Sequence, residues 1–143
     1  YGHSFENGTW KQTDQSPTSA TLGDGGVYSS LQDLAKWDRA LRDNTLLGKE
    51  EMHAALTPVN VAGVEQPDTR PAQYGFGWFL NPYKGHNRMW HYGETMGFRT
   101  AIQRFTDDGL TIIILCNRAD LNPTTLALQI ADVYFSGAGK QDQ

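Results

Sequence analysis

The chain has 143 residues, of which 38% are hydrophobic and 20% charged, with a formal net charge of -4. This composition fits one globular domain with a core, and the negative charge without a basic run argues against a general nucleic-acid-binding protein. No run of about 18 apolar residues is present, so we expect no membrane-spanning helix in this segment, and no signal peptide is visible at its start. The single cysteine, Cys116, lies in an apolar run, which excludes an internal disulfide and indicates a buried, inert thiol.

Residues 1–24 are rich in small polar residues, and Phe5 and Trp10 are their only large apolar anchors. They predict an extended, loop-like segment with room for one short strand. Such a stretch is unusual inside a compact domain. We therefore expect it to run across a neighbouring part of a longer protein.

Residues 25–58 predict a small helical lobe. Ser29 or Ser30 is suited to cap a helix, and Gln32 or Asp33 would complete a capping box. Apolar residues then recur at helical spacing, at Leu31, Leu34, Ala35, Trp37 and Leu41, with Trp37 expected in the core. Asp38 and Arg42 predict an ordinary surface ion pair, worth a few tenths of a kcal/mol. A second short helix is expected over residues 49–56, with Met52, Ala55 and Leu56 inward and His53 in solvent.

Residues 59–72 contain Gly63, Pro67 and Pro71, which predict a loop. Residues 72–136 then predict an antiparallel sheet and a helix. The first strands are expected at 74–80 and 89–92, separated by a turn at 81–85. Alternation would place Tyr74, Phe76 and Trp78 on one face of the first strand.

Residues 98–105 and 110–117 predict a hairpin whose turn, 106–109, contains Gly109. The second strand is nearly all apolar, so we expect cover on both faces. Asn122 and Pro123 would start a final helix, which would lay its larger apolar residues on the sheet, namely Leu126, Ile130, Val133 and Tyr134. A frayed tail is expected at 137–143.

The predicted fold class is therefore α/β of the α+β type, a partial domain with a sheet of three to five strands.

Residues 90–98 combine a strand-like start with glycines at 93 and 97, where we expect the chain to turn. His91 can change charge near neutral pH, and a glycine at a strand end lets a ligand approach closely. The segment is either the wall of a binding cleft or a strand with an aromatic belt that ends in a glycine turn. Spacing alone leaves both open and favours the second.

His91-Tyr92-Gly93, followed by Gly97-Phe98, resembles the third signature motif of the serine β-lactamase-like hydrolases. This superfamily includes class C β-lactamases, penicillin-binding D,D-peptidases, D-aminopeptidases and esterases, and the motif reads Lys-Thr-Gly in the lactamases and His-x-Gly in many others. Residues 25–35 and 74–78 resemble its Gly-Gly-x-x-Ser-Ser-x-x-Asp-Leu-Ala segment and its Tyr-Gly-x-Gly-Trp strand, in the same order. The resemblance implies the C-terminal portion of the β-lactamase/transpeptidase-like fold and hydrolysis of an amide, ester or β-lactam through an acyl-enzyme.

The superfamily takes its nucleophile from Ser-x-x-Lys, which a Tyr-x-Asn motif follows, and neither pattern occurs among the six serines and six tyrosines of this chain. We therefore expect a C-terminal part of a longer hydrolase, inactive alone, whose partner is the missing N-terminal half. The resemblance also implies a small-molecule or peptide substrate, no cofactor, and a periplasmic or secreted location in bacteria.

Carried over by the resemblance, His91 stands where the lactamases have lysine and would contact the substrate or leaving group. Gly93 would leave room for the acyl chain, and the backbone N–H of Glu94 would be one of two oxyanion-hole donors. Tyr92, Gly97 and Phe98 would line the substrate site, although Tyr92 points away from His91 and is suited to packing.

Two other interpretations use different chemistry. A binding or scaffold module would keep the fold without catalysis, as the missing nucleophile motif suggests. A metal site could use His86, His91 and Glu94, but their spacing is not that of a helical zinc motif, and His3 and His53 are remote in sequence. Exposed apolar surface and an open sheet edge also predict self-association or dependence on a second chain.

Overall fold

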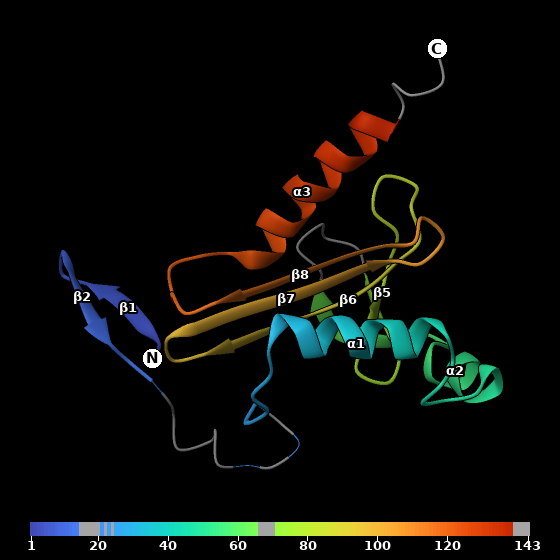
Figure 1. Ribbon diagram of the computed structural model, residues 1–143, viewed down its shortest axis with the longest axis horizontal. Helices are drawn as coiled ribbons and strands as arrows, with labels where there is room; N and C mark the ends of the chain where they lie inside the picture. Colours follow the sequence, from blue (N-terminus) through green and yellow to red (C-terminus); the bar gives the residue numbers. More distant parts are fainter. Residues whose placement is uncertain (15–20, 22, 24, 66–70, 139–143) are drawn as a thin grey trace. The chain divides into compact units, whose positions relative to one another are not determined.

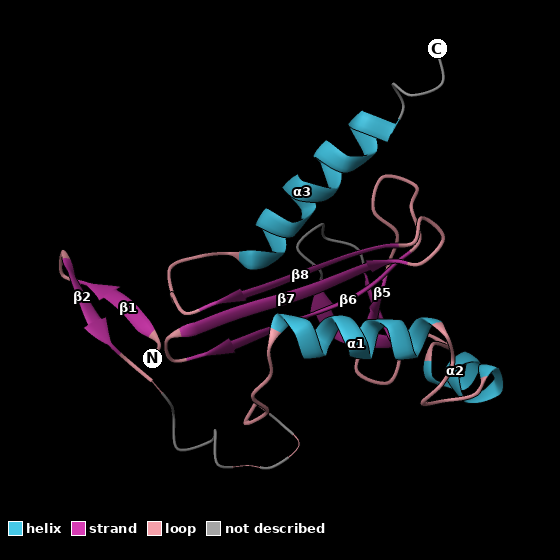
Figure 2. Cartoon of the chain, viewed as in Figure 1, coloured by secondary structure: helices cyan, strands magenta, loops and turns pink. Residues whose placement is uncertain are grey.

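The computed structural model describes residues 1–14, 21, 23, 25–65 and 71–138. In this part of the chain, three helices accompany a two-stranded sheet and a six-stranded sheet with the strand order β3-β4-β5-β6-β7-β8 (Figures 1 and 2). The pairings β1–β2, β3–β4, β4–β5 and β5–β6 are all antiparallel. The α+β class is confirmed, whereas the expected upper limit of five strands is too low.

The chain divides into two compact units, which are described separately. The first comprises Tyr1–Leu31, Tyr92–Gln103 and Ile112–Gln143, and the second comprises Gln32–His91 and Arg104–Thr111. No helix in the described ranges is long and apolar enough to cross a membrane.

A hairpin begins the first unit, where we expected a loop with one short strand at most. Its strands are β1 (His3–Glu6) and β2 (Thr9–Gln12). Asn7 and Gly8 make the turn with φ angles of 50° and 79°, a left-handed backbone that suits a tight hairpin. The N–H of His3 donates to the carbonyl of Asn117 over 3.0 Å, so the hairpin is tied to the segment after β8.

The C-terminal helix α3 (Pro123–Ala138) also belongs to the first unit. As predicted, Asn122 caps it, because its Oδ1 accepts the N–H of Thr125 over 3.0 Å. The prediction of which residues of this helix face inward is wrong, however. Ala127 and Ala131 are fully buried, because their small side chains allow a close approach. The larger apolar residues remain exposed, namely Leu126, Ile130, Val133 and Tyr134. The expected frayed tail begins inside this helix, and residues 139–143 lie outside the described part.

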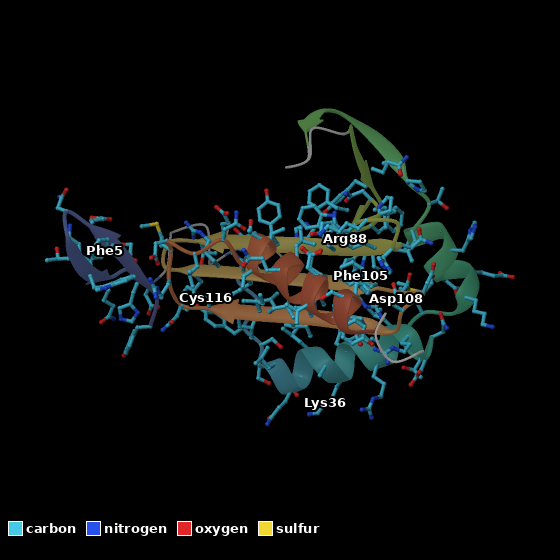
Figure 3. All side chains as sticks on the ribbon, turned by 90° about the horizontal axis from the view of Figure 1, so that it is seen from above. Phe5, Lys36, Arg88, Phe105, Asp108 and Cys116 are labelled. Atoms are coloured by element: carbon cyan, nitrogen blue, oxygen red, sulfur yellow. The ribbon has the colours of Figure 1, made fainter. Side chains whose placement is uncertain are left out.

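The second unit holds most of α1 (Leu31–Arg42) and all of α2 (Lys49–Ala55). Asp38 and Arg42 form the expected pair at 2.8 Å, but Asp38 is buried, so the prediction of a surface pair is wrong. The Nε of Arg104 and the hydroxyl of Thr111 donate to Oδ1 of Asp38 over 2.6 and 2.8 Å. Trp37 is only partly covered and stacks on Trp78. By contrast, Lys36 of the same helix is exposed (Figure 3).

Residues 59–72 are not a loop: they contain β3 (Val59–Glu65) and the start of β4 (Pro71–Tyr74). Pro67 lies outside the described residues. The strand expected at 74–80 is also wrong, since it breaks into β4 and β5 (Phe79–Leu80). Between them the N–H of Gly75 donates to the carbonyl of Trp78 over 2.8 Å, and Gly77 has a φ of 76°. This turn leaves Phe76 exposed and Trp78 buried, so they do not share a face.

Three longer strands follow, β6 (Arg88–Thr95), β7 (Phe98–Phe105) and β8 (Leu110–Cys116) (Figure 1). The β7–β8 hairpin and its turn are confirmed, with Gly109 at a φ of 63°. β6 does not end at Gly93 but continues to Thr95, so the chain turns only at Met96 and Gly97. The prediction that β8 is covered on both faces is wrong, because the Leu115 side chain is 40% exposed. Cys116 at the end of the strand is half-buried.

Candidate active site

The His91 imidazole lies in the second unit between aromatic rings from two neighbouring strands, Tyr74 of β4 and Phe79 of β5. Its Nε2 is 2.9 Å from the Tyr74 hydroxyl. The Phe79 ring stacks on it, with centroids 5.5 Å apart and an interplanar angle of 26°. Tyr74 and Phe79 also meet edge to face, with centroids 4.7 Å apart. The imidazole is therefore held by one hydrogen bond and by one ring stacked on its face.

Strand register explains why these residues meet. Tyr74 of β4 is paired with Phe79 of β5, and Phe79 is paired with Trp90 of β6. The short turn over residues 75–78 makes the first pairing possible, because Gly77 adopts a left-handed φ of 76° in the tight backbone that joins β4 to β5. Two motifs that are 17 residues apart in sequence, at Tyr74 and His91, are thereby brought together.

Burial raises the pKa of the Tyr74 hydroxyl above its ordinary value. The phenol therefore keeps its proton at neutral pH. A protonated hydroxyl can donate one hydrogen bond and accept others. It can serve either the neutral or the charged form of the imidazole beside it.

Gly93 lies in the first unit, opposite the hydroxyl of Thr100. A Cβ added at Gly93 would lie 2.6 Å from Oγ1 of Thr100, so a side chain here would displace that hydroxyl. The close approach of Thr100 thus explains why glycine suits this position. The role of Gly93 in leaving room for an acyl chain stays a prediction, and no sequence motif points to Thr100.

The Glu94 side chain is exposed, and its carboxylate lies 3.8 Å from Nε of Arg99. Arg99 also donates from Nη1 to the carbonyls of Thr95 and Phe98, over 2.5 and 2.8 Å. It therefore fastens the turn that follows Glu94. The proposed oxyanion-hole role of the Glu94 N–H stays a prediction, and Arg99 was not anticipated from the sequence.

Gly97 is buried where the chain's first residues pass. A Cβ added there would overlap the backbone of Thr13, Gly2 and His3, so only glycine fits. Phe98 is half-buried beside the same segment, since its ring lies where a Cβ on Gly2 would be. Tyr92 is 45% exposed. Substrate binding by Tyr92, Gly97 and Phe98 stays a prediction, and the observed role of Gly97 is close backbone packing.

The residues of the alternative metal site have other partners. Nδ1 of His86 lies 3.0 Å from both carboxylate oxygens of Asp108. Asp108 itself belongs to the turn between β7 and β8 (Figure 3). His91 pairs with Tyr74, and Glu94 lies near Arg99. Within the ranges that the structure describes, no three histidine, cysteine, aspartate or glutamate residues are grouped to hold a metal ion.

Comparison with known proteins shows the family to which this chain belongs. The Beta-lactamase family model matches residues 2–134. Penicillin-binding protein 4* of Bacillus subtilis (strain 168) is 35% identical over 100 residues, which are 68% of this chain and 21% of that protein. A D-aminopeptidase of Gluconobacter oxydans (strain 621H) is 29% identical over 96 residues, 66% of this chain and 17% of that protein. The chain thus spans about a fifth of the length of these curated relatives, and no solved structure matched. The chain belongs to the Beta-lactamase family of serine β-lactamase-like hydrolases.

Proposed function

We propose that this chain is the C-terminal part of a serine hydrolase whose nucleophile lies upstream of Tyr1 in a longer protein. The enzyme would cleave an amide, ester or β-lactam through an acyl-enzyme that water then hydrolyses. One observation carries the proposal: His91-Tyr92-Gly93 lies on a continuous strand, β6, within the residues that the Beta-lactamase model matches. The Ser-x-x-Lys pattern is absent from the chain, which supports a nucleophile supplied from elsewhere.

In this proposal β6 forms one wall of the acylation site. His91 contributes the polar group beside the nucleophile and contacts the substrate or leaving group. The N–H of Glu94 donates to the developing oxyanion, a type of contact whose loss costs about 2.7–4 kcal/mol in other hydrolases. Gly93 presents no side chain on the same strand, so an acyl group can lie against the backbone.

The substrate class follows from the chemistry of the relatives. Their names indicate penicillin binding and D-aminopeptidase activity. We propose a small-molecule or peptide carbonyl substrate, acted on in the periplasm or outside a bacterial cell without a cofactor. Because residue 91 is histidine, where lactamases have lysine, the proposed substrates include esters, amides and peptides as well as β-lactams.

The proposed partner is the N-terminal half of the same hydrolase. Leu126, Ile130, Val133 and Tyr134 form an exposed apolar face on α3, which we call the outer α3 face. Exposed apolar patches of this kind mark interaction surfaces. The chain alone would then be inactive and would associate with itself through such surfaces.

Intact-mass spectrometry after treatment with a penicillin or a fluorophosphonate tests the proposal. The chain is compared with the product of the same gene extended upstream. We expect an adduct on the extended protein alone, on a serine before Tyr1. An adduct on the chain itself would refute the missing nucleophile, and an extended protein without Ser-x-x-Lys and without an adduct would favour the non-catalytic scaffold.

A further inference from the structure

Arg99 contacts three groups at the end of β6, all of them in the first unit. Its Nη1 donates to the carbonyl of Thr95 over 2.5 Å and to the carbonyl of Phe98 over 2.8 Å. Its Nε lies 3.8 Å from a carboxylate oxygen of Glu94. A guanidinium is always charged and has only donors, so the direction of both hydrogen bonds is fixed. One side chain therefore ties together the two residues that flank the Met96–Gly97 turn between β6 and β7 (Figure 1).

The two carbonyl bonds of Arg99 restrain the turn more strongly than its ion pair does. The Arg99 side chain is 19% exposed, whereas that of Glu94 is 59% exposed. A charge pair at 3.8 Å with one partner in solvent is weakened by the high dielectric constant of water. The carbonyl bonds are short and charge-assisted, and the group that makes them is half-buried. Arg99 thus acts mainly on the backbone of the turn.

The backbone N–H of Glu94 lies between two restrained positions. On one side, Gly93 faces Thr100, where a Cβ on Gly93 would come within 2.6 Å of the hydroxyl oxygen. On the other side, Arg99 holds the carbonyl of Thr95. Peptide groups are planar, so the N–H of Glu94 can tilt only if the backbone dihedral angles beside it change. The two contacts therefore limit this tilt.

A separate contact holds the turn to the start of the chain. The N–H of His3 donates to the carbonyl of Gly97 over 3.3 Å. The backbone of Gly2 and Thr13 also packs closely on Gly97, where no side chain fits. Loss of the Arg99 bonds should therefore loosen the β6 side of the turn without detaching the turn from the first unit.

We propose that Arg99 is a positioning residue that holds the end of β6 and so aims the Glu94 N–H at the developing oxyanion. The catalytic part of this inference rests on the proposed function, whereas the local restraint does not. An oxyanion donor is effective when it is already aimed before the charge develops, because no reorganisation is then needed during the reaction. A misaligned donor should therefore slow acylation and leave the preceding binding of substrate almost unchanged.

Amide hydrogen exchange in the 143-residue chain tests the local restraint. Arg99→Met keeps an unbranched side chain of similar bulk and removes all of its donors. We expect the amides of residues 94–97 to exchange about 10-fold faster in this variant, because hydrogen bonds from a charged donor hinder local opening by at least that factor. The amides of Ile112–Ile114 in β8 should keep their wild-type rates, which would show that the unit stays folded. Unchanged exchange at 94–97, or an equal acceleration in β8, would overturn the proposal.

Arg99→Lys separates the effect of the two carbonyl bonds from that of the positive charge. Lysine keeps a charge near Glu94, but its ammonium is a point charge on a shorter side chain and lacks the planar fork. We expect exchange at 94–97 in Arg99→Lys to resemble that in Arg99→Met. Wild-type exchange in Arg99→Lys would show that the charge restrains the turn, and it would overturn the role given to the carbonyl bonds.

Acylation of the extended protein by a penicillin tests the catalytic part. Arg99→Met should lower the rate constant at saturating penicillin by about 10- to 100-fold and change the half-saturating concentration by less than about 3-fold. The loss is smaller than for deletion of an oxyanion donor, because the N–H is displaced and not removed. A boronic acid forms a tetrahedral adduct with a nucleophilic serine and resembles the transition state, so it should bind more weakly by a similar factor. The matched control Arg39→Met changes an exposed arginine of α1 and should react like wild type.

The two experiments separate failure of this inference from failure of the proposed function. Faster exchange at 94–97 with wild-type acylation and boronic acid binding would overturn the catalytic role of Arg99. A higher half-saturating concentration with a wild-type rate constant would overturn it as well, since Arg99 would then act on substrate binding. A wild-type extended protein that neither a penicillin nor a fluorophosphonate acylates would refute the proposed function, and Arg99 would remain only a structural restraint on the turn.

Discussion

Replacing Asp38 with asparagine tests how α1 is held in the second unit. The side chains of Asp38 and Arg104 are 7% and 6% exposed, and Oδ1 accepts hydrogen bonds from both Arg104 and Thr111. Asparagine keeps the shape but removes the charge that faces the buried guanidinium. Removing one partner of a buried ion pair costs about 3–5 kcal/mol, because the other charge stays buried without a counter-charge.

The loss should fall near the lower end of that range. Arg104 keeps a hydrogen bond to the backbone carbonyl of Asp38 at 3.2 Å, and its guanidinium stays 6.0 Å from the centroid of the Trp78 ring. We therefore expect Asp38→Asn to lower the free energy of unfolding by about 3 kcal/mol. This is a large share of the roughly 5–15 kcal/mol that stabilises an ordinary domain.

The effect should depend on pH in one direction. Burial by itself would raise the pKa of Asp38, but hydrogen bonds from Arg104 and Thr111 and the charges of Arg104 and Arg42 outweigh it, so the pKa is lower than usual. A lowered pKa in the folded state gives stability that is fully present above the unfolded carboxyl pKa of about 3.9. The stability is lost as the pH falls through the folded pKa. The difference between wild type and Asp38→Asn should be constant at neutral pH and shrink only below about pH 4.

Urea unfolding followed by tryptophan fluorescence measures this difference, since Trp37 and Trp78 stack in the same unit. The matched control is Asp33→Asn on the same helix. Asp33 pairs with Lys36 at 2.8 Å, but both side chains are more than half exposed. Such surface pairs contribute about 0–1 kcal/mol. Equal losses in the two variants would refute the view that Asp38 is a buried anchor.

Two further changes test packing in the first unit. Gly97→Ala should cost about 1–3 kcal/mol in urea unfolding, because its Cβ would overlap the backbone of Thr13 and Gly2. Gly137→Ala, where nothing lies within 4 Å, is the control and should be neutral or stabilising; equal effects would contradict the packing role of Gly97. Ile130→Glu on the outer α3 face should weaken self-association in analytical ultracentrifugation without lowering stability, since Ile130 is 44% exposed. A monodisperse wild-type monomer at high concentration, or an unchanged sedimentation profile in the variant, would count against association through this face.

Local signals in the sequence predicted the elements that depend on few residues. Gly109 marked the β7–β8 turn, and Asn122 with Pro123 marked the start of α3, because these residues act within one turn of the chain. Asn7-Gly8 is a hairpin signal of the same kind, but the prediction for residues 1–24 rests on their polar composition, which favours a loop. The inner face of α3 was wrong for a related reason: size was used to choose the buried residues, and alanines form that face.

Contacts between distant residues could not be predicted in this way. Asp38 looked like a surface residue because its buried partner, Arg104, is 66 positions away. The Tyr74 contact depends on how β4, β5 and β6 are paired, and the break at Gly75–Trp78 that permits this pairing was interpreted as a continuous strand. The family motif pointed to His91, whose role stays a prediction, but it did not predict the Phe79 ring and the Tyr74 hydroxyl that contact its imidazole.

The acylation rate of the extended protein, measured with and without His91, tests most directly whether β6 forms a wall of the catalytic site. We compare wild type, His91→Ala and the control His53→Ala, whose histidine lies on α2 with an exposed side chain. We expect His91→Ala to slow acylation by a penicillin by at least about 100-fold, as is usual when a polar group near a nucleophile is lost, and His53→Ala to react like wild type. Acylation of His91→Ala at the wild-type rate would contradict the assignment of β6 to the active site.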